Sequence, residues 1–299
     1  MARDQASVLR RRAQAAGLFR PDPDGDPART RTVAVSGGKG GVGKSNVSLN
    51  LACHLGETGR EVILLDTDFG LPNLDVLTGC SPARSIGDVM RGRCRAGEAL
   101  YSVMPGVRLL AGGQMWSDEY SHREQVRALL GALSAQMAGA DYMIMDTQAG
   151  VAPAVMGLLL ASETALMVTT PEPPALMDCY RTIKGLCRAG YEGEIAVVVN
   201  RARGGEAERA FAQLQHMVRS FLARRIRLLA WIPEDPSVGA AVQRQVPLLR
   251  GFPHSRASEG IRRLGAAISG EPSRDRHPAR AFLRRLARYM SGGEGDADG

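Results

Sequence analysis

The chain carries, from residue 36 to residue 45, the run Ser36-Gly37-Gly38-Lys39-Gly40-Gly41-Val42-Gly43-Lys44-Ser45. Gly38 to Ser45 satisfies the pattern G-x-x-x-x-G-K-[ST], in which the N–H groups of a glycine-rich turn surround phosphate oxygens. A short β-branched stretch at residues 32–35 precedes the run, and apolar residues at helical spacing follow from Asn46. Strand, loop and helix is the order that this pattern requires. The flanks therefore favour a phosphate-binding loop over a glycine-rich surface turn.

Each residue type in this loop suits the binding of a nucleotide. The glycines let N–H groups point inward, and the N-terminus of the following helix adds partial positive charge. Lys44 is predicted to reach the β- and γ-phosphates, and the Ser45 hydroxyl to bind Mg²⁺. The predicted nucleotide-binding residues of the loop are Gly38, Lys39, Gly40, Gly41, Val42, Gly43, Lys44, Ser45 and Asn46.

A second lysine, Lys39, lies in the same loop and is not required by the general pattern. Of the 38 lysines and arginines in the chain, only Lys39, Lys44 and Lys184 are lysines. A slim ammonium group fits beside a phosphate inside a glycine turn, where a broad planar guanidinium would be crowded. We therefore interpret Lys39 as a chemical requirement of the loop.

The composition sets limits on the class of protein. A chain of 299 residues can form one α/β domain of about 240–260 residues with tails. A formal net charge of +7 permits an acidic partner, whether membrane, nucleic acid or protein, without choosing among them. The five cysteines form no C-x-x-C, which favours reduced thiols over a disulfide framework or a zinc site. No signal-peptide-like or membrane-spanning apolar segment is visible, so a cytoplasmic location is expected.

Four regions are predicted along the chain. Residues 1–20 read as a short basic amphipathic helix, and the Pro- and Asp-rich residues 21–30 as a flexible linker. Residues 31–270 form the nucleotide-binding domain. Residues 271–299 comprise a second linker, a second amphipathic helix and a polar tail.

The domain is predicted to be α/β, with a doubly wound, mostly parallel sheet and helices on both faces. Its apolar runs are almost continuous rather than alternating, as expected of strands that are covered on both sides, and helical patterns separate them. The predicted strands cover Val33–Val35, Val62–Leu65, Val107–Leu110, Tyr142–Met145, Ala165–Thr169, Ile195–Val199 and Leu228–Ile232.

In such a sheet the ligand groups gather at the carboxyl ends of the strands. Asp66 and Asp68 end the second predicted strand, and Asp146 ends the fourth. Such residues also form turns, but two such strand ends beside a phosphate loop favour a Mg²⁺ site. Asp66 and Asp146 are predicted to act on the metal together with Ser45. Asp68 is predicted to orient the attacking water.

Two further strand ends are predicted to face the nucleotide. The sixth strand ends in Asn200 and Arg201, and the seventh in Ile232-Pro233. Asn200 is expected to pair with the edge of the base, and Pro233 and its neighbours are expected to pack against the ring of the base. A plain strand-to-loop turn is the alternative.

The C-terminal region contains the second amphipathic helix, from Pro278 to Met290. Its apolar side chains gather on one face and its arginines surround the rest, which fits an interfacial helix attracted to anionic lipid. The predicted membrane residues are Phe282, Leu283, Leu286 and Tyr289. The alternative is a helix that docks on its own domain.

Taken together, these motifs resemble the MinD/FlhG family of ATPases. The loop has the family's variant form KGGxGK[ST], and the segments Asp66–Asp75 and Asp146–Gly150 are also similar. Three stretches favour the FlhG branch, also called FleN or YlxH. They are Asp4-Gln5-Ala6 followed by Leu9-Arg10, Thr170–Tyr180 with Ile183-Lys184, and Phe221-Leu222 through Gln245. Gln148, where MinD has proline, departs from the family pattern, as do Phe69 and Pro72.

The resemblance implies a MinD-like P-loop ATPase that hydrolyses ATP slowly, with Lys39, Lys44 and Asp68 as the catalytic residues. It implies an ATP-dependent homodimer in which Lys39 reaches the partner subunit's nucleotide. It also implies that Asp4 and Gln5 stimulate the SRP-type GTPase FlhF, with a flagellar switch-complex protein or transcription regulator as further partners. The protein would attach reversibly to the inner face of the cell membrane, including the cell pole, and would control flagellar number and placement.

Three other functions remain open at this stage. A MinD-like regulator of the division site shares the ATPase core. A ParA-like partitioning ATPase would bind DNA, which we do not expect, because it needs neither the amphipathic C-terminus nor the Asp4-Gln5 tail. A binding module would hold ATP without turnover and recruit partners.

Overall fold

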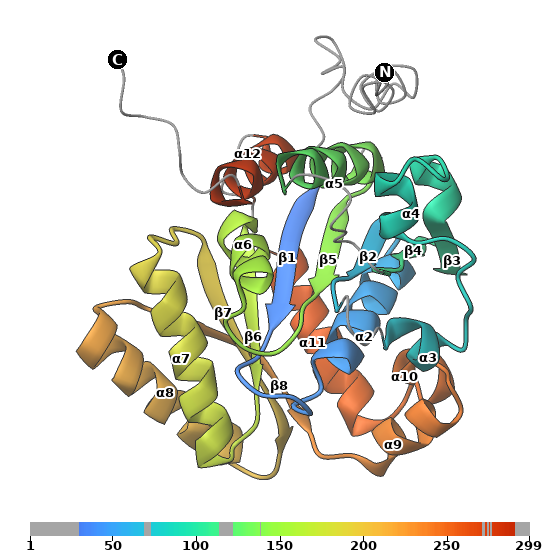
Figure 1. Ribbon diagram of the computed structural model, residues 1–299. Helices are drawn as coiled ribbons and strands as arrows, with labels where there is room; N and C mark the ends of the chain where they lie inside the picture. The colour runs from blue at the N-terminus through green and yellow to red at the C-terminus, as the bar shows by residue number, and fades with distance from the viewer. Residues whose placement is uncertain are drawn as a thin grey trace, which may run out of the picture.

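A computed structural model of the chain describes residues 30–68, 73–113, 122–137, 139–270, 273, 275 and 277–290. Within these residues the chain forms one mixed sheet covered by helices on both faces (Figure 1). The strands are β1 (Arg31–Ser36), β2 (Val62–Asp66), β3 (Leu100–Met104), β4 (Val107–Leu110), β5 (Tyr142–Asp146), β6 (Thr164–Thr169), β7 (Glu194–Ala202) and β8 (Arg227–Pro233).

The sheet has the order β3-β4-β2-β5-β1-β6-β7-β8. All neighbours pair in parallel except β3, which runs antiparallel to β4. The predicted doubly wound α/β fold is confirmed, and each of the seven predicted apolar runs lies in a strand. The sequence did not predict β3, an edge strand that forms a local hairpin with β4 around Pro105 and Gly106.

Helices cover both faces of this sheet. They are α2 (Lys44–Glu57), α3 (Leu74–Thr78), α4 (Ile86–Met90), α5 (His122–Met137), α6 (Pro153–Ala161), α7 (Pro173–Arg188), α8 (Glu206–Leu222), α9 (Pro236–Gln243), α10 (Leu248–Gly251), α11 (Arg256–Ser269) and α12 (Pro278–Met290), with a 3₁₀ turn at Ala96–Ala99.

Two hydrophobic clusters separate the layers. One cluster joins the sheet to α2, α3, α9, α10 and α11, and the other joins it to α4, α5, α6, α7, α8 and α12. The central strands alternate their side chains between the clusters, as Val33 and Ala34 do on β1. Because both faces are covered, these strands read as continuous apolar runs in the sequence.

The C-terminal helix α12 lies on the domain, beside α5 and α6 and over β1 (Figure 1). Phe282 and Leu286 are completely buried there, and Leu283 packs against the same cluster. Helix α12 therefore packs into the core of the domain that was predicted to end at residue 270. The docked helix, which the sequence left as an alternative, is the arrangement in the structure.

Candidate functional site: a phosphate loop between acidic strand ends

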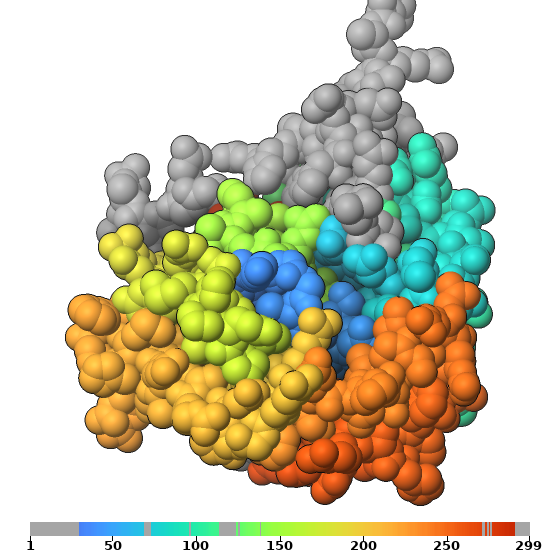
Figure 2. All heavy atoms as spheres, turned by 90° about the horizontal axis from the view of Figure 1, so that it is seen from below, coloured from blue at the N-terminus to red at the C-terminus, as the bar shows by residue number. Residues whose placement is uncertain are grey.

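The glycine-rich run forms the connection between β1 and α2, as predicted. Helix α2 begins at Lys44, directly after Gly43, whose φ of 95° lies in the left-handed region that favours glycine. Gly38 lies so close to α7 that a Cβ atom would be 2.0 Å from the carbonyl carbon of Asp178. Seen from the end of the sheet where the loop lies, its blue atoms occupy the middle of the face (Figure 2).

Asn200, at the end of β7, supports this loop. Its side-chain amide donates a hydrogen bond of 2.8 Å to the carbonyl oxygen of Val42, and its Oδ1 accepts one of 3.0 Å from the N–H of Arg201. A Cβ on Gly43 would lie 2.3 Å from the Asn200 amide nitrogen. The structure thus gives Asn200 a contact that the sequence did not predict. Its pairing with a base stays a prediction.

The other residues predicted to face the nucleotide lie close to Asn200. Arg201 is exposed and has a positive φ of 55°. Pro233 is buried at the end of β8, where it pairs in register with Ala202. The loops that follow β7 and β8 are joined by an ion pair between Arg203 and Glu234. These strand ends lie at the same edge as the phosphate loop, and their contact with a nucleotide stays a prediction.

Asp66 and Asp146 are paired directly across β2 and β5, and both are almost fully buried. The carboxylate of Asp66 accepts hydrogen bonds from the backbone N–H groups of Asp68 at 2.9 Å and of Asn73 and Leu74 at 3.2 Å each. Asp66 therefore shapes the start of α3. Burial, with a smaller contribution from the nearby Asp146 carboxylate, raises its pKa to about 7 against the opposing effect of these backbone hydrogen bonds.

A residue in the first turns of α2 binds the carboxylate of Asp146. Its Oδ1 accepts a hydrogen bond of 2.9 Å from the hydroxyl of Ser48, one turn after Lys44. Burial raises the pKa of Asp146 to about 6, against the opposing effects of Ser45, Ser48 and Lys44. Burial also lowers the pKa of Lys44, while the carboxylates of Asp146 and Asp68 act in the opposite direction. The structure thus brings Lys44, Ser45 and Asp146 together.

These donors fit a hard divalent cation such as Mg²⁺. The hydroxyl of Ser45 and the carboxylates of Asp66 and Asp146 are oxygen ligands, which Mg²⁺ prefers. Burial is the main cause of the raised pKa values of both carboxyls, and a bound cation would stabilise their charged forms. Among the described residues no group of three or more His, Cys, Asp or Glu could hold a metal alone. Water and phosphate oxygens would complete the set.

Asp68 and Gln148 meet where the loops after β2 and β5 run side by side. The amide nitrogen of Gln148 donates a hydrogen bond of 2.6 Å to Oδ1 of Asp68. Between them, Thr67 binds the carbonyl oxygen of Asp146 through both its N–H, at 2.9 Å, and its hydroxyl, at 2.7 Å. Asp68 is thus placed at the mouth of the site, beside Asp146 and Lys44.

Lys39 lies on the outer side of the loop and is exposed. Within its own subunit it is near Glu172, whose pKa is lowered chiefly by a hydrogen bond with Thr170 and additionally by the charges of Arg201 and Lys39. An exposed lysine at this edge is accessible to another molecule. The cross-subunit role of Lys39 stays a prediction.

Binding residues were also predicted near both ends of the chain, in the N-terminal region and in α12. Asp4 and Gln5 lie outside the described residues, and so do Phe69 and Pro72. The side chains of Phe282 and Leu286 are fully buried in this conformation, and their contact with a membrane stays a prediction. Tyr289 remains 37% exposed and lies against Gly157 of α6. No helix among the described residues is both long and apolar enough to cross a membrane.

Sequence reasoning missed two residues that the structure places at the site. Ser48 follows Lys44 by four residues, so it lies on the same face of α2, and this spacing was a usable signal. Gln148 was noted as a departure from the family pattern, but its contact with Asp68 could not be read from the sequence.

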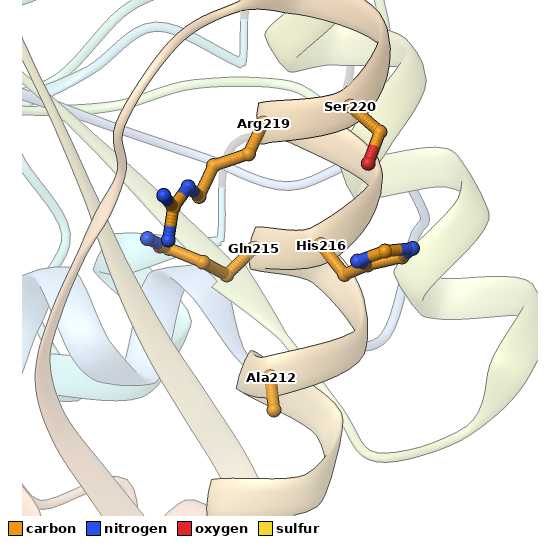
Figure 3. Close-up of a pocket in the computed structure, with 5 residues that line it drawn as sticks. All are labelled: Ala212, Gln215, His216, Arg219 and Ser220. Atoms are coloured by element: carbon orange, nitrogen blue, oxygen red, sulfur yellow. The ribbon is translucent and has the colours of Figure 1, made fainter.

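A separate pocket lies on α8, and its lining residues come from that helix alone. Gln215 and Arg219 lie on one side of the helix and His216 and Ser220 on the other, with Ala212 a turn away (Figure 3). None of these residues was predicted to bind a ligand, and none belongs to the phosphate loop or the acidic strand ends.

Comparison with known proteins identifies the family. The ParA family model, described as NUBPL iron-transfer P-loop NTPase, matches residues 29–269. The antiactivator FleN of Pseudomonas aeruginosa is 35% identical over 88% of this chain and 95% of its own length. This chain belongs to the FleN branch of the MinD/ParA family of P-loop NTPases.

Further members of the MinD/ParA family are similar over most of the chain. The flagellum site-determining protein YlxH of Helicobacter pylori is 27% identical over 87% of this chain and 91% of its own length. The MinD protein of Pyrococcus horikoshii, solved with Mg-ADP, superposes with a TM-score of 0.65 at 26% identity, covering 81% of this chain and 96% of its own. The description of the ParA model names iron transfer. This sequence contains no C-x-x-C motif.

Proposed function

We propose that this protein is an ATP-dependent switch that controls the number and placement of flagella. The similarity to FleN over nearly the full length of both chains carries the proposal. The phosphate loop, flanked by Asp68 and Asp146, supports ATP as the ligand. The Mg-ADP complex of the related MinD supports Mg²⁺ as the companion ion.

The proposed chemistry is slow hydrolysis of ATP. Lys44 and the loop N–H groups hold the phosphates, and Ser45, Asp66 and Asp146 would hold Mg²⁺ directly or through water. When bound, the ion neutralises phosphate charge. Asp68 orients the attacking water, and Lys39 stabilises charge on the nucleotide of a partner subunit. Such catalysis is mainly positioning and electrostatic stabilisation.

We also propose that ATP drives a soluble monomer into a two-fold dimer that associates with the membrane. In the conformation described here α12 presents Arg280, Arg284 and Arg288 to solvent, whereas Phe282 and Leu286 are buried. Membrane binding through the apolar face therefore requires α12 to leave the domain. Two anchors in one dimer would bind more tightly than one.

Phosphate release and particle mass test the switch. Purified protein with Mg-ATP is expected to release phosphate and to double in mass in light scattering, and Lys39→Ala is expected to prevent both. A Lys39→Ala protein that dimerises and hydrolyses ATP as the unchanged protein does would contradict the cross-subunit role. Adding the SRP-type GTPase FlhF tests whether that partner engages the chain, with Asp4→Ala and Gln5→Ala as matched variants.

Counting flagella tests the biological role. Cells that lack the gene are expected to carry an altered number of flagella, with division septa in their usual place. The similarity to MinD of Thermotoga maritima, 31% identical over 80% of this chain, supports a second candidate. Displaced septa with an unchanged flagellar number would favour that division role.

A further inference from the structure

The hydrogen bond between Gln148 and Asp68 follows from the register of the sheet. Asp66 and Asp146 are partners across β2 and β5, and Thr67 continues the pairing through its two bonds to the Asp146 carbonyl. The two loops therefore remain side by side for two more residues. Side chains two residues apart on an extended chain share a face. Gln148 is thus held opposite Asp68 by the sheet itself.

The contact between the two side chains is direct. At 2.6 Å the distance from the Gln148 amide nitrogen to Asp68 Oδ1 is slightly shorter than the usual range for an N–H group bound to oxygen. Both side chains are half-buried, so water competes only partly for the bond. A neutral amide can fix the rotamer of a carboxylate without placing a positive charge beside it.

We propose that Gln148 is the positioning residue for Asp68 in ATP hydrolysis. The bond holds one carboxylate oxygen, so the side chain keeps one orientation in which the second oxygen can accept a hydrogen bond from the attacking water. Reaction rates depend steeply on such alignment. This inference rests on the proposed function, because it requires that Asp68 orient the water.

If the Gln148–Asp68 contact only fastened the two loops together, its loss would change other measured quantities. Its loss would lower the stability of the fold or raise KM, because the loops help to shape the nucleotide site. A positioning contact acts after ATP is bound, and its loss lowers kcat while KM and ATP affinity remain unchanged.

The test measures kcat, KM and ATP affinity for Gln148 variants of the full chain. Gln148→Met keeps the length of the side chain but has no donor, and kcat is expected to fall about tenfold. Gln148→His keeps an N–H group at similar reach and is expected to retain kcat within about threefold. Gln148→Glu places a second carboxylate beside Asp68, and its kcat is expected to fall below that of Gln148→Met. Gln213→Met, on the exposed surface of α8, is the matched control.

A double-mutant cycle separates this inference from the proposed function. In an Asp68→Asn background, Gln148→Met is expected to cause no further loss of kcat. Independent, additive losses would overturn the positioning role, and so would a Gln148→Met protein with unchanged kcat. Normal turnover by Asp68→Asn alone would instead overturn the role of Asp68 in the proposed function. If Gln148→Met does not fold, equal kcat values for Gln148→His and Gln148→Glu would overturn the inference.

Discussion

The side-chain amide of Asn200 lies 2.8 Å from the carbonyl oxygen of Val42 and donates a hydrogen bond to it. This bond ties the end of β7 to the phosphate loop, although 158 residues separate the two in sequence. Val42 is buried, so its carbonyl oxygen would have no easy replacement partner if the amide were lost. The conformation of the loop therefore depends on a strand that lies two positions away from β1 in the sheet.

Asn200→Asp is expected to weaken nucleotide binding. A carboxylate cannot donate a hydrogen bond to the Val42 carbonyl, and it adds negative charge beside the phosphates. Losing a buried hydrogen bond costs about 1–3 kcal/mol, so ATP affinity measured by calorimetry is expected to fall at least about fivefold. Asn200→Ala, which removes the bond without adding charge, is expected to give a smaller loss. Equal ATP affinity for the unchanged protein, Asn200→Asp and Asn200→Ala would show that the phosphate loop does not need the hydrogen bond from Asn200.

Gly43→Ala is expected to destabilise the folded protein, whereas Gly40→Ala is not. At Gly43 a Cβ would meet the Asn200 amide, and the left-handed φ costs a non-glycine residue about 1–2 kcal/mol. At Gly40 a Cβ would have no atom within 4 Å. Urea unfolding of the nucleotide-free proteins measures the difference in the free energy of unfolding. Equal losses at both positions would contradict the conformation described for the loop.

Phe282→Ala is expected to lower the free energy of unfolding by about 3–5 kcal/mol, because it creates a cavity between α12 and the sheet. Arg284→Ala, on the exposed side of the same helix, is expected to change it by less than about 0.5 kcal/mol. Chemical denaturation of both variants without nucleotide makes the comparison. A Phe282→Ala protein as stable as Arg284→Ala would mean that α12 is not docked in solution.

The nucleotide-free protein is expected to lose stability as pH rises from about 4 to about 7. Burial raises the pKa values of Asp66 and Asp146 to about 7 and about 6 from an ordinary 3.8, so in this window the folded state binds more protons than the unfolded state. Unfolding free energies measured at pH 5 and pH 8 without Mg²⁺ show the loss. Asp146→Asn is expected to reduce the pH dependence, and Glu208→Gln, on exposed α8, to leave it unchanged. A stability that rises over this window would contradict the sign of the shifts.

The sequence was informative where physical chemistry allows few alternatives. An eight-residue phosphate-loop pattern between a strand and a helix leaves few alternatives, and seven short apolar runs separated by helical patterns are readily assigned to buried strands. Edge strand β3 was not predicted because its residues are partly exposed and its pairing with β4 is local, so it has no buried apolar run. Its antiparallel direction could not be inferred from the crossovers that define the rest of the sheet.

Helix α12 shows a second limit of prediction from the sequence. Phe282 and Leu286 lie on one face because of helical spacing, and that face can cover a lipid surface or a protein core equally well. Only the packing of α12 against α5 and α6 decides between them, and such packing depends on the three-dimensional fold. The partners of Asn200 and Gln148 were hidden for the same reason. Each contact depends on which strand ends are neighbours, which the sequence does not state.

The position of α12 over β1 has a consequence for the order in which the domain is made. The first strand of the sheet leaves the ribosome early, but the helix that covers part of it is synthesised only after all the other strands. During that interval the apolar surface that later receives Phe282 is open to solvent. A newly made chain therefore exposes this surface to chaperones and to aggregation until residue 290 has been added and α12 has closed over it.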